Sequence, residues 1–407
     1  MRATTAFNRL LALTGARVID VRFAGEGITV LVALRRRRLV CSRCGQVYRA
    51  TYDSAWRRWR HLDVAGQRCF IAYELRRVEC RDCGVWVEAV PWARPDARHT
   101  RDFENLVAFC AQQMAKSQVQ ALLRIAWDTV GRIVERVVAD HLDESRLAGL
   151  VAIGCDELSY RRGQRYLTNV ADHASGRIVW SSPGRNAQTL EAFFDALGER
   201  KRSIRAVSID MSGGYERAIR AVLPDARIAF DPFHVVALAG RAVDDVRRAE
   251  WNAKGKSRTP EGKWLKNVRF ALRKAPDKLT DRQRVALAQI QHTNAQLFRA
   301  YLLKEQLRQL YHLDDPTSDA EAHLDAWLAW ASRSRLRPFV RLARTIRRYR
   351  DGILAAVTLG LTNARLEGLH SKVRLLSHRS FGFHSAAPLI ALIYLCCARI
   401  TINLPLR

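Results

Sequence analysis

VAIGCDELSYRRGQRYLTNVADHASGRIVWSSPG, residues 151–184, is the stretch that decides the fold of the central part of this 407-residue chain. Apolar and polar residues alternate along it in three short runs. An Arg/Gly turn at 161–163 and a Ser-Gly turn at 175–176 separate the runs. Alternation with a period of two residues, bounded by turn signals, predicts three short antiparallel strands.

The segments that follow complete the pattern. NAQTLEAFFDALGERK (186–201) predicts a helix, IRAVSID (204–210) a buried strand, MSGGYERAIRAVLP (211–224) a second helix and ARIAF (226–230) a fifth strand. Three antiparallel strands followed by strand–helix–strand is the order of the ribonuclease H-like α/β fold.

Two acidic residues occupy special positions in that fold. Asp156 lies on the central first strand, and Asp210 ends the adjacent fourth strand, where side chains leave the sheet. Neighbouring carboxylates repel each other, and a divalent metal ion relieves that repulsion, so the pair predicts a metal site. The alternative for Asp210 is a capping role at the following helix, although Ser212 can fill that role.

Other acids compete with Asp156. Glu157 follows it directly, but alternation along a strand sends neighbouring side chains to opposite faces, so only one of them can join Asp210. Asp172 closes the second strand at a turn, where Asp serves turn chemistry. Asp231-Pro-Phe-His234 has two readings: a helix start with Asp as N-cap and Pro at the first helical position, or a pair beside the metal site.

The N-terminal region, residues 1–95, reads as a β domain with two cysteine knuckles. Each C-x-x-C pair is followed by Gly, which permits the tight turn whose amides face the sulfurs. Four such thiolates predict one structural Zn²⁺ site, with unmetallated cysteines as the alternative. The ligands are Cys41, Cys44, Cys80 and Cys83.

Residues 96–148 switch to helical periodicity, and three segments fit a helix-turn-helix: 103–114, 117–125 and 127–138. Ser117 and Asp128 are the expected N-caps of the last two helices. If the last helix enters a DNA major groove, it presents Thr129, Arg132 and Arg136. A three-helix linker domain is the equally weighted alternative.

The remaining segments give the domain plan. The ribonuclease H-like core runs over 149–240, an all-α stretch rich in Arg, Lys and Trp over 241–350, and the C-terminal helices of the core over 351–407. The fold class is therefore multidomain α+β: a zinc-binding β domain, a helix-turn-helix and an α/β core interrupted by an α-helical insertion.

The charge of the chain points to nucleic acid. A net charge of +28 and a pI near 10.6 create a field that attracts a polyanion. Arg dominates the basic residues and suits phosphate and guanine edges, although a codon bias toward Arg gives the same excess. The sequence has no signal peptide and no membrane-length apolar run, and its unpaired cysteines fit a reducing cytosol, so we expect a cytoplasmic, nucleoid-associated protein.

These motifs, in this order, resemble the ISL-three (ISL3) family of bacterial insertion-sequence transposases, which belong to the DDE group and have a ribonuclease H-like core. The resemblance covers the knuckles, the helix-turn-helix, "DELSYRRGQRYLTNVAD", "VSIDMSGGYERAI", "FDPFHVV" and "TNARLEGLHSKVRLLSHRSFGF". The family commonly has Gly-His where Gly163-Gln164 stands, and often Asn near His370.

The resemblance implies that Asp156, Asp210 and Glu367 form the catalytic triad, with Asp231 and His234 near the site. Glu367 is the only carboxylate in the basic segment 361–385, and His370 is the only basic residue three or four positions from it. Lys372 and Arg379 share another helix face that can follow a DNA backbone.

The implied activity is Mg²⁺-dependent DNA end cleavage and strand transfer by two metal ions, with Mn²⁺ as a substitute. The expected partners are double-stranded DNA, as terminal inverted repeats and target, and further copies of the chain in a homodimer or larger synaptic complex. Two alternatives remain: a catalytically silent, zinc-containing DNA-binding regulator, and a structure-specific nuclease on the same fold.

Overall fold

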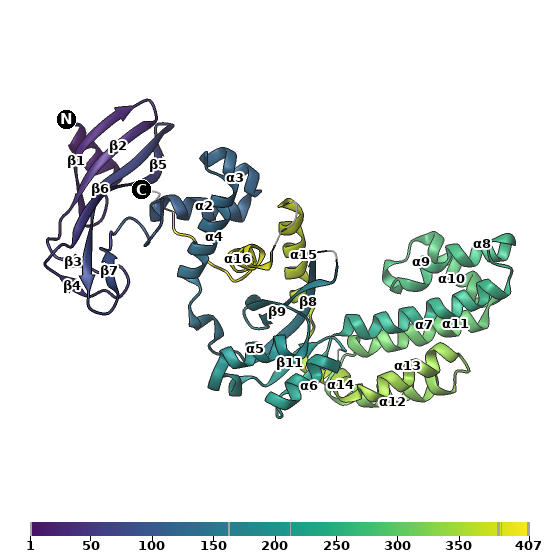
Figure 1. Cartoon of the computed structure of the whole chain (residues 1–407). Coiled ribbons are helices and arrows are strands. Elements are labelled where there is room, and N and C mark those ends of the chain that lie inside the picture. Colours follow the sequence, from purple (N-terminus) through teal and green to yellow (C-terminus); the bar gives the residue numbers. More distant parts are fainter. Residues whose placement is uncertain (1, 162, 212, 381–382, 384, 405–407) are drawn as a thin grey trace. The chain divides into compact units, whose positions relative to one another are not determined.

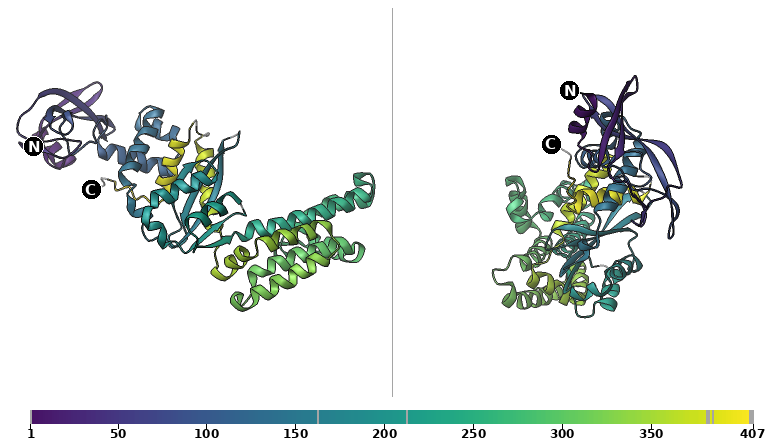
Figure 2. Two further views of the ribbon diagram at one scale, coloured as in Figure 1. Left: turned by 60° about the horizontal axis from the view of Figure 1, so that its bottom comes forward. Right: turned by 90° about the vertical axis from the view of Figure 1, so that its left-hand side faces the viewer.

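The computed structural model describes residues 2–161, 163–211, 213–380, 383 and 385–404. Its contacts divide the chain into two compact units, and Figures 1 and 2 show the elements of each. The first unit consists of Met1–Asp143 and Ala387–Arg407, and the second of Glu144–Ala386.

The first unit begins with a short helix, α1 (Ala3–Leu11), and a five-stranded sheet. Four strands follow the order β1-β2-β6-β5, and the fifth, β7, pairs with β6. Their bounds are β1 (Ala16–Ala24), β2 (Gly27–Leu34), β5 (Asp53–Val64), β6 (Gln67–Cys80) and β7 (Gly84–Val87). A two-stranded hairpin, β3 (Leu39–Val40) and β4 (Val47–Tyr48), carries the first cysteine knuckle. The predicted N-terminal β domain is therefore present.

Three helices follow in the same unit: α2 (Arg101–Gln113), α3 (Lys116–Leu123) and α4 (Trp127–His141). Thr100 caps α2 by accepting a hydrogen bond from the Phe103 amide at 3.3 Å. The two N-caps expected from the sequence are wrong, because α3 and α4 begin earlier, after the extended residues Ala115 and Ala126. The Gln118 side chain instead accepts from the Ala115 amide at 3.0 Å.

The contacts group the last described helix, α16 (Ala386–Cys397), with the first unit from Ala387 on. Gln112 on α2 donates to the carbonyl oxygens of Leu395 and Ile400, at 2.9 Å and 3.2 Å. The contacts therefore group residues 387–407 differently from the sequence-based division, which places 351–407 in a single segment of the core.

The second unit is built on a five-stranded sheet with the order β10-β9-β8-β11-β12. The strands β8 (Ala152–Arg161), β9 (Arg165–Asp172) and β10 (Arg177–Pro183) are antiparallel to one another. The strands β11 (Ala206–Ile209) and β12 (Arg227–Phe230) run parallel to β8. The helices α5 (Ala187–Leu197) and α6 (Gly213–Val222) connect them. This is the predicted ribonuclease H-like order, with β8 in the centre; Ser212, the alternative cap before α6, lies outside the described residues.

An α-helical insertion follows β12, and its helices lie side by side as an elongated bundle (Figures 1 and 2). Its first helix, α7, starts in the core and continues without a break into the insertion, so no boundary falls at residue 240. Buried apolar residues of the sheet and the insertion form one continuous core. The helices are α7 (Pro232–Ala253), α8 (Pro260–Asn267), α9 (Arg269–Arg273), α10 (Asp281–Thr293), α11 (Ala295–Gln309), α12 (Pro316–Arg333) and α13 (Arg337–Arg348).

Two further helices return to the sheet. Helix α14 (Arg350–Leu359) packs on β12, and α15 (Ala364–Arg379) packs on the central strand β8. No helix in the described part of the chain is both long and apolar enough to span a bilayer.

Candidate functional site

One row of polar side chains crosses the sheet of the second unit. On the antiparallel side, Ser181 pairs with Asn169 and Asn169 pairs with Asp156. Strands β8 and β11 pair in parallel as far as Gly154 and Ser208, which precede Asp156 and Asp210 by two residues each. Strands β11 and β12 are in register up to the residues directly before Asp210 and Asp231. Because neighbouring strands lie about 4.8 Å apart, Asp156, Asp210 and Asp231 stand at one level on adjacent parallel strands. We call these three residues the acidic row.

Helix α15 begins directly above this row. The amide of Asn363, the residue before the helix, donates to Asp231 Oδ1 at 3.1 Å, and its side-chain Oδ1 accepts from Ser208 Oγ at 2.5 Å. A Cβ atom on Gly154 would lie 3.1 Å from Asn363 Oδ1. Glycine at this position of β8 therefore lets the helix start this close to the sheet.

A chain of polar contacts runs from the sheet through α15 to Asp156. Ser181 Oγ donates to Asn169 Oδ1 at 2.8 Å, so the amide nitrogen of Asn169 faces His370 Nε2, 3.0 Å away. That ring nitrogen must then accept, which places the imidazole proton on Nδ1, 3.2 Å from Asp156 Oδ2. His370 is almost completely buried, and these contacts favour the Nδ1–H tautomer of its ring and hold it beside Asp156 Oδ2.

Asp210 has a different partner. His234, in the first turn of α7, places Nε2 at 3.0 Å from Asp210 Oδ1 and at 3.9 Å from Asp231 Oδ2. The hydrogen bond to Asp210 raises the pKa of His234 above its ordinary value. Asp231 is also the N-cap residue of α7, with Pro232 at the first helical position. The Asp231-Pro-Phe-His234 motif therefore starts a helix, and His234 lies beside Asp210.

Glu157 lies on the other face of the sheet, as strand alternation predicts. It hydrogen-bonds Tyr215 of α6, and burial together with the nearby charge of Asp210 raises its pKa. Asp172 accepts from the amides of Ala174 and Ser175, which is the turn chemistry expected for it.

Glu367 lies one turn before His370, on the face of α15 that also presents Asn363. It is exposed, and no hydrogen bond or ion pair of its carboxylate is found within the part of the chain described. Its oxygens do not lie within 4.8 Å of both Asp156 and Asp210, since the only such group of three or more candidate ligands among the described residues is the cysteine cluster. The structure therefore places Asp156 and Asp210 on neighbouring strands and Glu367 on the facing helix.

The donor set of the row fits a hard divalent cation. Carboxylate oxygens are the ligands that Mg²⁺ and Mn²⁺ prefer. Asp210 Oδ1 is buried, and its partner among the described residues is the imidazole of His234. Such an oxygen has unused capacity for a cation.

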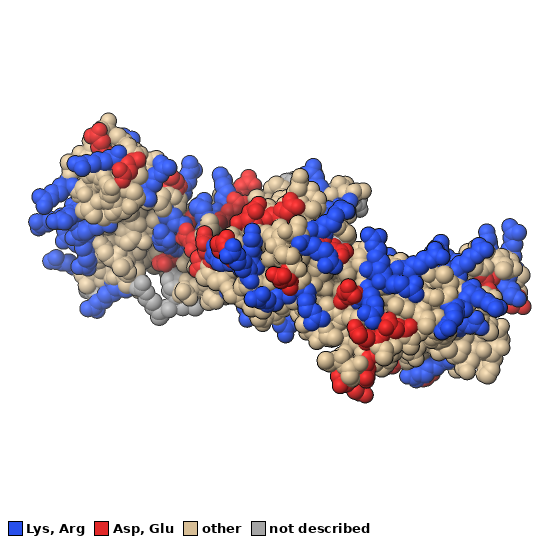
Figure 3. All heavy atoms as spheres, turned by 90° about the horizontal axis from the view of Figure 1, so that it is seen from below, with Lys and Arg blue, Asp and Glu red and all other residues tan. Residues whose placement is uncertain are grey.

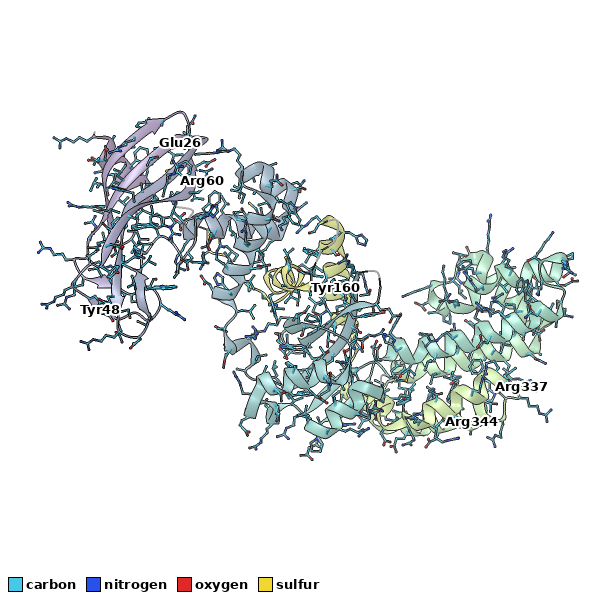
Figure 4. All side chains as sticks on the ribbon, in the orientation of Figure 1. Glu26, Tyr48, Arg60, Tyr160, Arg337 and Arg344 are labelled. Carbon is cyan, nitrogen blue, oxygen red and sulfur yellow. The ribbon has the colours of Figure 1, made fainter. Side chains whose placement is uncertain are left out.

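The four knuckle cysteines of the first unit converge as predicted. One sulfur of each lies within 4.8 Å of the other three, and Cys44 Sγ and Cys80 Sγ are 3.5 Å apart. Gly45 and Gly84, which follow the two knuckles, have φ values of +80° and +71°, a conformation that glycine adopts readily. The Tyr48 hydroxyl, labelled in Figure 4, donates to Cys80 Sγ at 3.2 Å. Cys41, Cys44, Cys80 and Cys83 would hold a structural zinc ion as thiolates.

The candidate DNA-binding residues differ in their exposure. On α4, Arg132 is exposed and Thr129 half-buried, whereas Arg136 donates through Nε to the buried Glu104 at 3.1 Å. That ion pair ties α4 to α2 and engages Arg136 within the domain. On α15, Lys372 is exposed and Arg379 half-buried.

Comparisons with known proteins agree with this architecture. A family model described as "Transposase", of the DDE type and the ISL3 family, matches residues 153–393. The model "Helix-turn-helix domain of transposase family ISL3" matches residues 88–138, and "zinc-finger of transposase IS204/IS1001/IS1096/IS1165" matches residues 29–83.

Curated relatives match over nearly their whole length. The chain is 42% identical to the "Transposase for insertion sequence element IS1557" of Mycobacterium tuberculosis, covering 100% of this chain and 98% of the relative. It is 29% identical to the "Transposase for insertion sequence element IS1001" of Bordetella parapertussis, covering 88% and 89%. Among solved structures, the "Drosophila P element transposase strand transfer complex" aligns with a TM-score of 0.40 and 10% identity, over 74% of this chain and 92% of that one.

Sequence reasoning missed the contacts that hold the row in place. His370 and Asn169 are 201 positions apart in the chain, and neither spacing nor periodicity links them. One signal was available: His370 follows Glu367 by three residues, so that both lie on the same helix face.

Proposed function

Because the chain belongs to the ISL3 family of DDE transposases, we propose that Asp156, Asp210 and Glu367 are the three carboxylates that carry its DNA cleavage and strand transfer. The observation that carries this proposal is the placement of Asp156 and Asp210 at one level on adjacent parallel strands. Asp231 and His234 serve as neighbours of that pair.

The position of Glu367 supports its inclusion. Its helix, α15, is fixed on the row by Asn363 and His370 at its first and second turns. Glu367 lies between these two anchors in the sequence and is exposed. A movement of its carboxylate toward Asp156 on binding of metal and DNA requires no change in the anchors.

Two Mg²⁺ or Mn²⁺ ions held by these carboxylates would activate the attacking oxygen and stabilise the leaving oxygen of the displaced strand. The protein's own residues orient that site. His370 holds the Oδ2 atom of Asp156, and His234 holds Oδ1 of Asp210 until a stronger cation competes for it. Basic surfaces bind the DNA phosphates.

The first unit supplies end recognition in this proposal. The helix-turn-helix presents Thr129 and Arg132 of α4 to the terminal inverted repeats, and the zinc domain adds phosphate contacts. On α15, Lys372 and Arg379 follow the DNA backbone near the cleavage site.

The helical insertion carries a stripe of arginines that fits double-stranded DNA. Arg337, Arg341, Arg344 and Arg348 recur every three or four residues along α13, are all exposed, and have no acidic partner among the described residues. Figure 4 labels two of them on the outside of the bundle, and Figure 3 shows basic side chains spread along the insertion. We call this set the α13 stripe and assign it to phosphate contacts.

Assembly and location complete the proposal. Both ends of a mobile element must be bound and cleaved in one complex, so the active form is a homodimer or a larger synaptic complex on DNA. The net charge of +28 supports an association with the bacterial nucleoid in the cytoplasm.

The test is end cleavage on strand-labelled DNA that carries the element's terminal inverted repeats. With wild-type protein and Mg²⁺ or Mn²⁺, we expect a nick at each end followed by joining of the freed 3′ end to target DNA, and no product when neither metal is added. Cleavage without joining would identify a nuclease. Binding of the ends without cleavage under either metal would identify a regulator and refute the proposal.

A further inference from the structure

A groove of about 720 Å³ runs along α7 in the helical insertion, with α9 and α11 forming its other side. It begins at Phe233, the residue before His234, and so adjoins the acidic row. Neither the acidic row nor the α13 stripe includes any of its residues.

The groove carries a surplus of positive charge. Its cations are Arg241, Arg248, Arg273, Lys304 and Arg308, against the two acids Asp244 and Asp245. Three of the cations already have acidic partners: Arg248 pairs with Asp244, while Lys304 and Arg308 pair with Glu305.

Arg241 and Arg273 are different. Both are exposed, and within the described part of the chain neither guanidinium makes an ion pair or a hydrogen bond. Two unpaired guanidinium groups facing one groove form a site for an anion, and an arginine fork matches the oxygens of a phosphate group.

An aromatic ring stands at the catalytic end of the groove. Phe233 is 60% exposed, which is unusual for phenylalanine, and its ring meets that of His234 edge-to-face at 5.5 Å. Its flat face remains available for stacking.

The floor of the groove is lined by small residues. Ala237 and Gly240 follow Phe233 at helical spacing on one face of α7, and Ala275 lies opposite them. The helix rises by about 12 Å between Phe233 and Arg241, a length that matches about two nucleotides of an extended strand.

We propose that this groove binds a single DNA strand next to the cleavage position, with Phe233 stacked on an unpaired base and Arg241 and Arg273 on its phosphates. The proposal rests on the proposed function in one respect: cleavage at the acidic row sets the direction of the strand, which runs from there past Phe233 into the groove. A duplex does not meet the requirement, because a protein ring stacks only on a base whose face is uncovered.

The experiment uses the full-length, zinc-loaded protein, a twelve-nucleotide oligothymidylate with one central 2-aminopurine, and a blunt duplex of equal length, all in buffer without added Mg²⁺ or Mn²⁺ and without a chelator. Fluorescence anisotropy gives both affinities, and 2-aminopurine fluorescence reports stacking directly. Phe233→Ala, and separately the double variant Arg241→Ala/Arg273→Ala, should each weaken binding of the single strand by about tenfold. Phe233→Trp should retain binding and the stacking signal, whereas Phe233→Ala should lose the signal.

Two control variants lie on α10, outside the groove. Val285→Ala removes an exposed apolar side chain and Arg282→Ala an exposed arginine, and both should bind the single strand as wild type does. Equal loss of duplex and single-strand affinity in the groove variants would overturn the proposal, as would an unchanged affinity or a loss of equal size in the controls.

The same measurement separates this proposal from the proposed function. No cleavage is expected without added Mg²⁺ or Mn²⁺, so Asp210→Asn should bind the single strand normally even though it cannot cut DNA. Loss of strand binding in the groove variants of a protein that never cleaves would support the groove and refute the catalytic assignment. Normal cleavage by the wild-type protein, together with unaffected strand binding in the groove variants, would support the catalytic assignment and refute the groove.

Discussion

Asp156 and Asp210 stand at one level of the sheet, but their immediate partners differ. Asp156 Oδ2 lies 3.2 Å from Nδ1 of the buried His370, whose other ring nitrogen contacts Asn169, whereas Asp210 faces the half-buried His234. The contact between His370 and Asp156 is held in place by Asn169, whereas the contact between His234 and Asp210 can be replaced by a metal ion. We infer that Asp156 sets the geometry of the site and that Asp210 changes partner when a metal ion binds.

The first prediction concerns His370. His370→Leu removes the donor to Asp156 and leaves the Asn169 amide without its acceptor, so the metal concentration for half-maximal cleavage should rise about 10- to 100-fold. A metal titration of end cleavage measures this shift. His378→Leu, which changes a second histidine of the same helix, is the matched control. An unchanged metal requirement in His370→Leu would show that the histidine only fills space.

At the residue scale, the positions of Asp156 and Asp210 on their strands could be predicted from the sequence, but the residues that contact them could not. Asp156 and Asp210 could be identified because alternation and strand ends are local properties. The pairing of His370 with Asp156 could not, because it joins residues 214 positions apart and depends on where α15 lands on the sheet. The roles of Glu157 and Asp172 were also predictable, since each follows from strand alternation or turn chemistry.

At the scale of elements, the helix starts show where local reasoning failed. Ser117 and Asp128 have the side chains of good caps, but helices α3 and α4 begin at Lys116 and Trp127, after alanines. A side-chain cap contributes only about 1 kcal/mol, so packing of the three helices outweighs it. Trp327 of the insertion is a packing residue: it is buried and donates to the Leu303 carbonyl oxygen at 2.7 Å.

The zinc knuckles give the second prediction. Removal of zinc with a chelator, or the substitution Cys80→Ser, should unfold the knuckle region, because the free energy of zinc binding is part of the folding free energy of this region. Limited proteolysis should then cut within residues 39–90 while the second unit stays intact, and zinc release can be followed with a colorimetric indicator. Cys110→Ala, a buried cysteine outside the cluster, should retain zinc. A knuckle region that resists protease without zinc would contradict the assignment.

The α13 stripe gives the third prediction. Removal of one phosphate contact lowers the slope of log K against log salt by about 0.9, so Arg341→Ala/Arg344→Ala should lower it by nearly 2 and weaken duplex binding at low salt. Titrations of duplex DNA at several salt concentrations measure the slope. Arg350, which pairs with Asp325 at 3.1 Å, is the control, and Arg350→Ala should leave the slope unchanged. An unaltered slope in the double variant would remove the stripe from the DNA path.

At the scale of the whole molecule, the order of domains was predictable and the membership of the last segment was not. Composition and periodicity change sharply at the zinc domain, the helix-turn-helix and the core, and these changes are visible in the sequence. The apolar helix α16 has no periodicity that reveals its partner. Its grouping with the first unit rests on tertiary contacts such as that of Gln112 with Leu395.

This grouping gives the fourth prediction. A chain that stops at residue 386 should lose stability in the first unit and not in the second, because α16 buries Leu389, Ile393 and Leu395. Hydrogen exchange should accelerate in α2 and α4 and stay unchanged in β8 to β12. Faster exchange in the sheet, with α2 and α4 protected, would assign α16 to the core instead.

The central claim is that Asp156, Asp210 and Glu367 act together in DNA cleavage, and Glu367→Gln tests it most directly. The substitution keeps the size and helix propensity of the side chain and removes only its charge, so it should leave folding and DNA affinity intact. The measurement is cleavage of strand-labelled ends in Mg²⁺, beside a binding titration of the same DNA and the control Glu191→Gln on α5. We predict that Glu367→Gln binds the ends normally and that its cleavage falls by at least about a thousandfold; cleavage near the wild-type rate would contradict the triad.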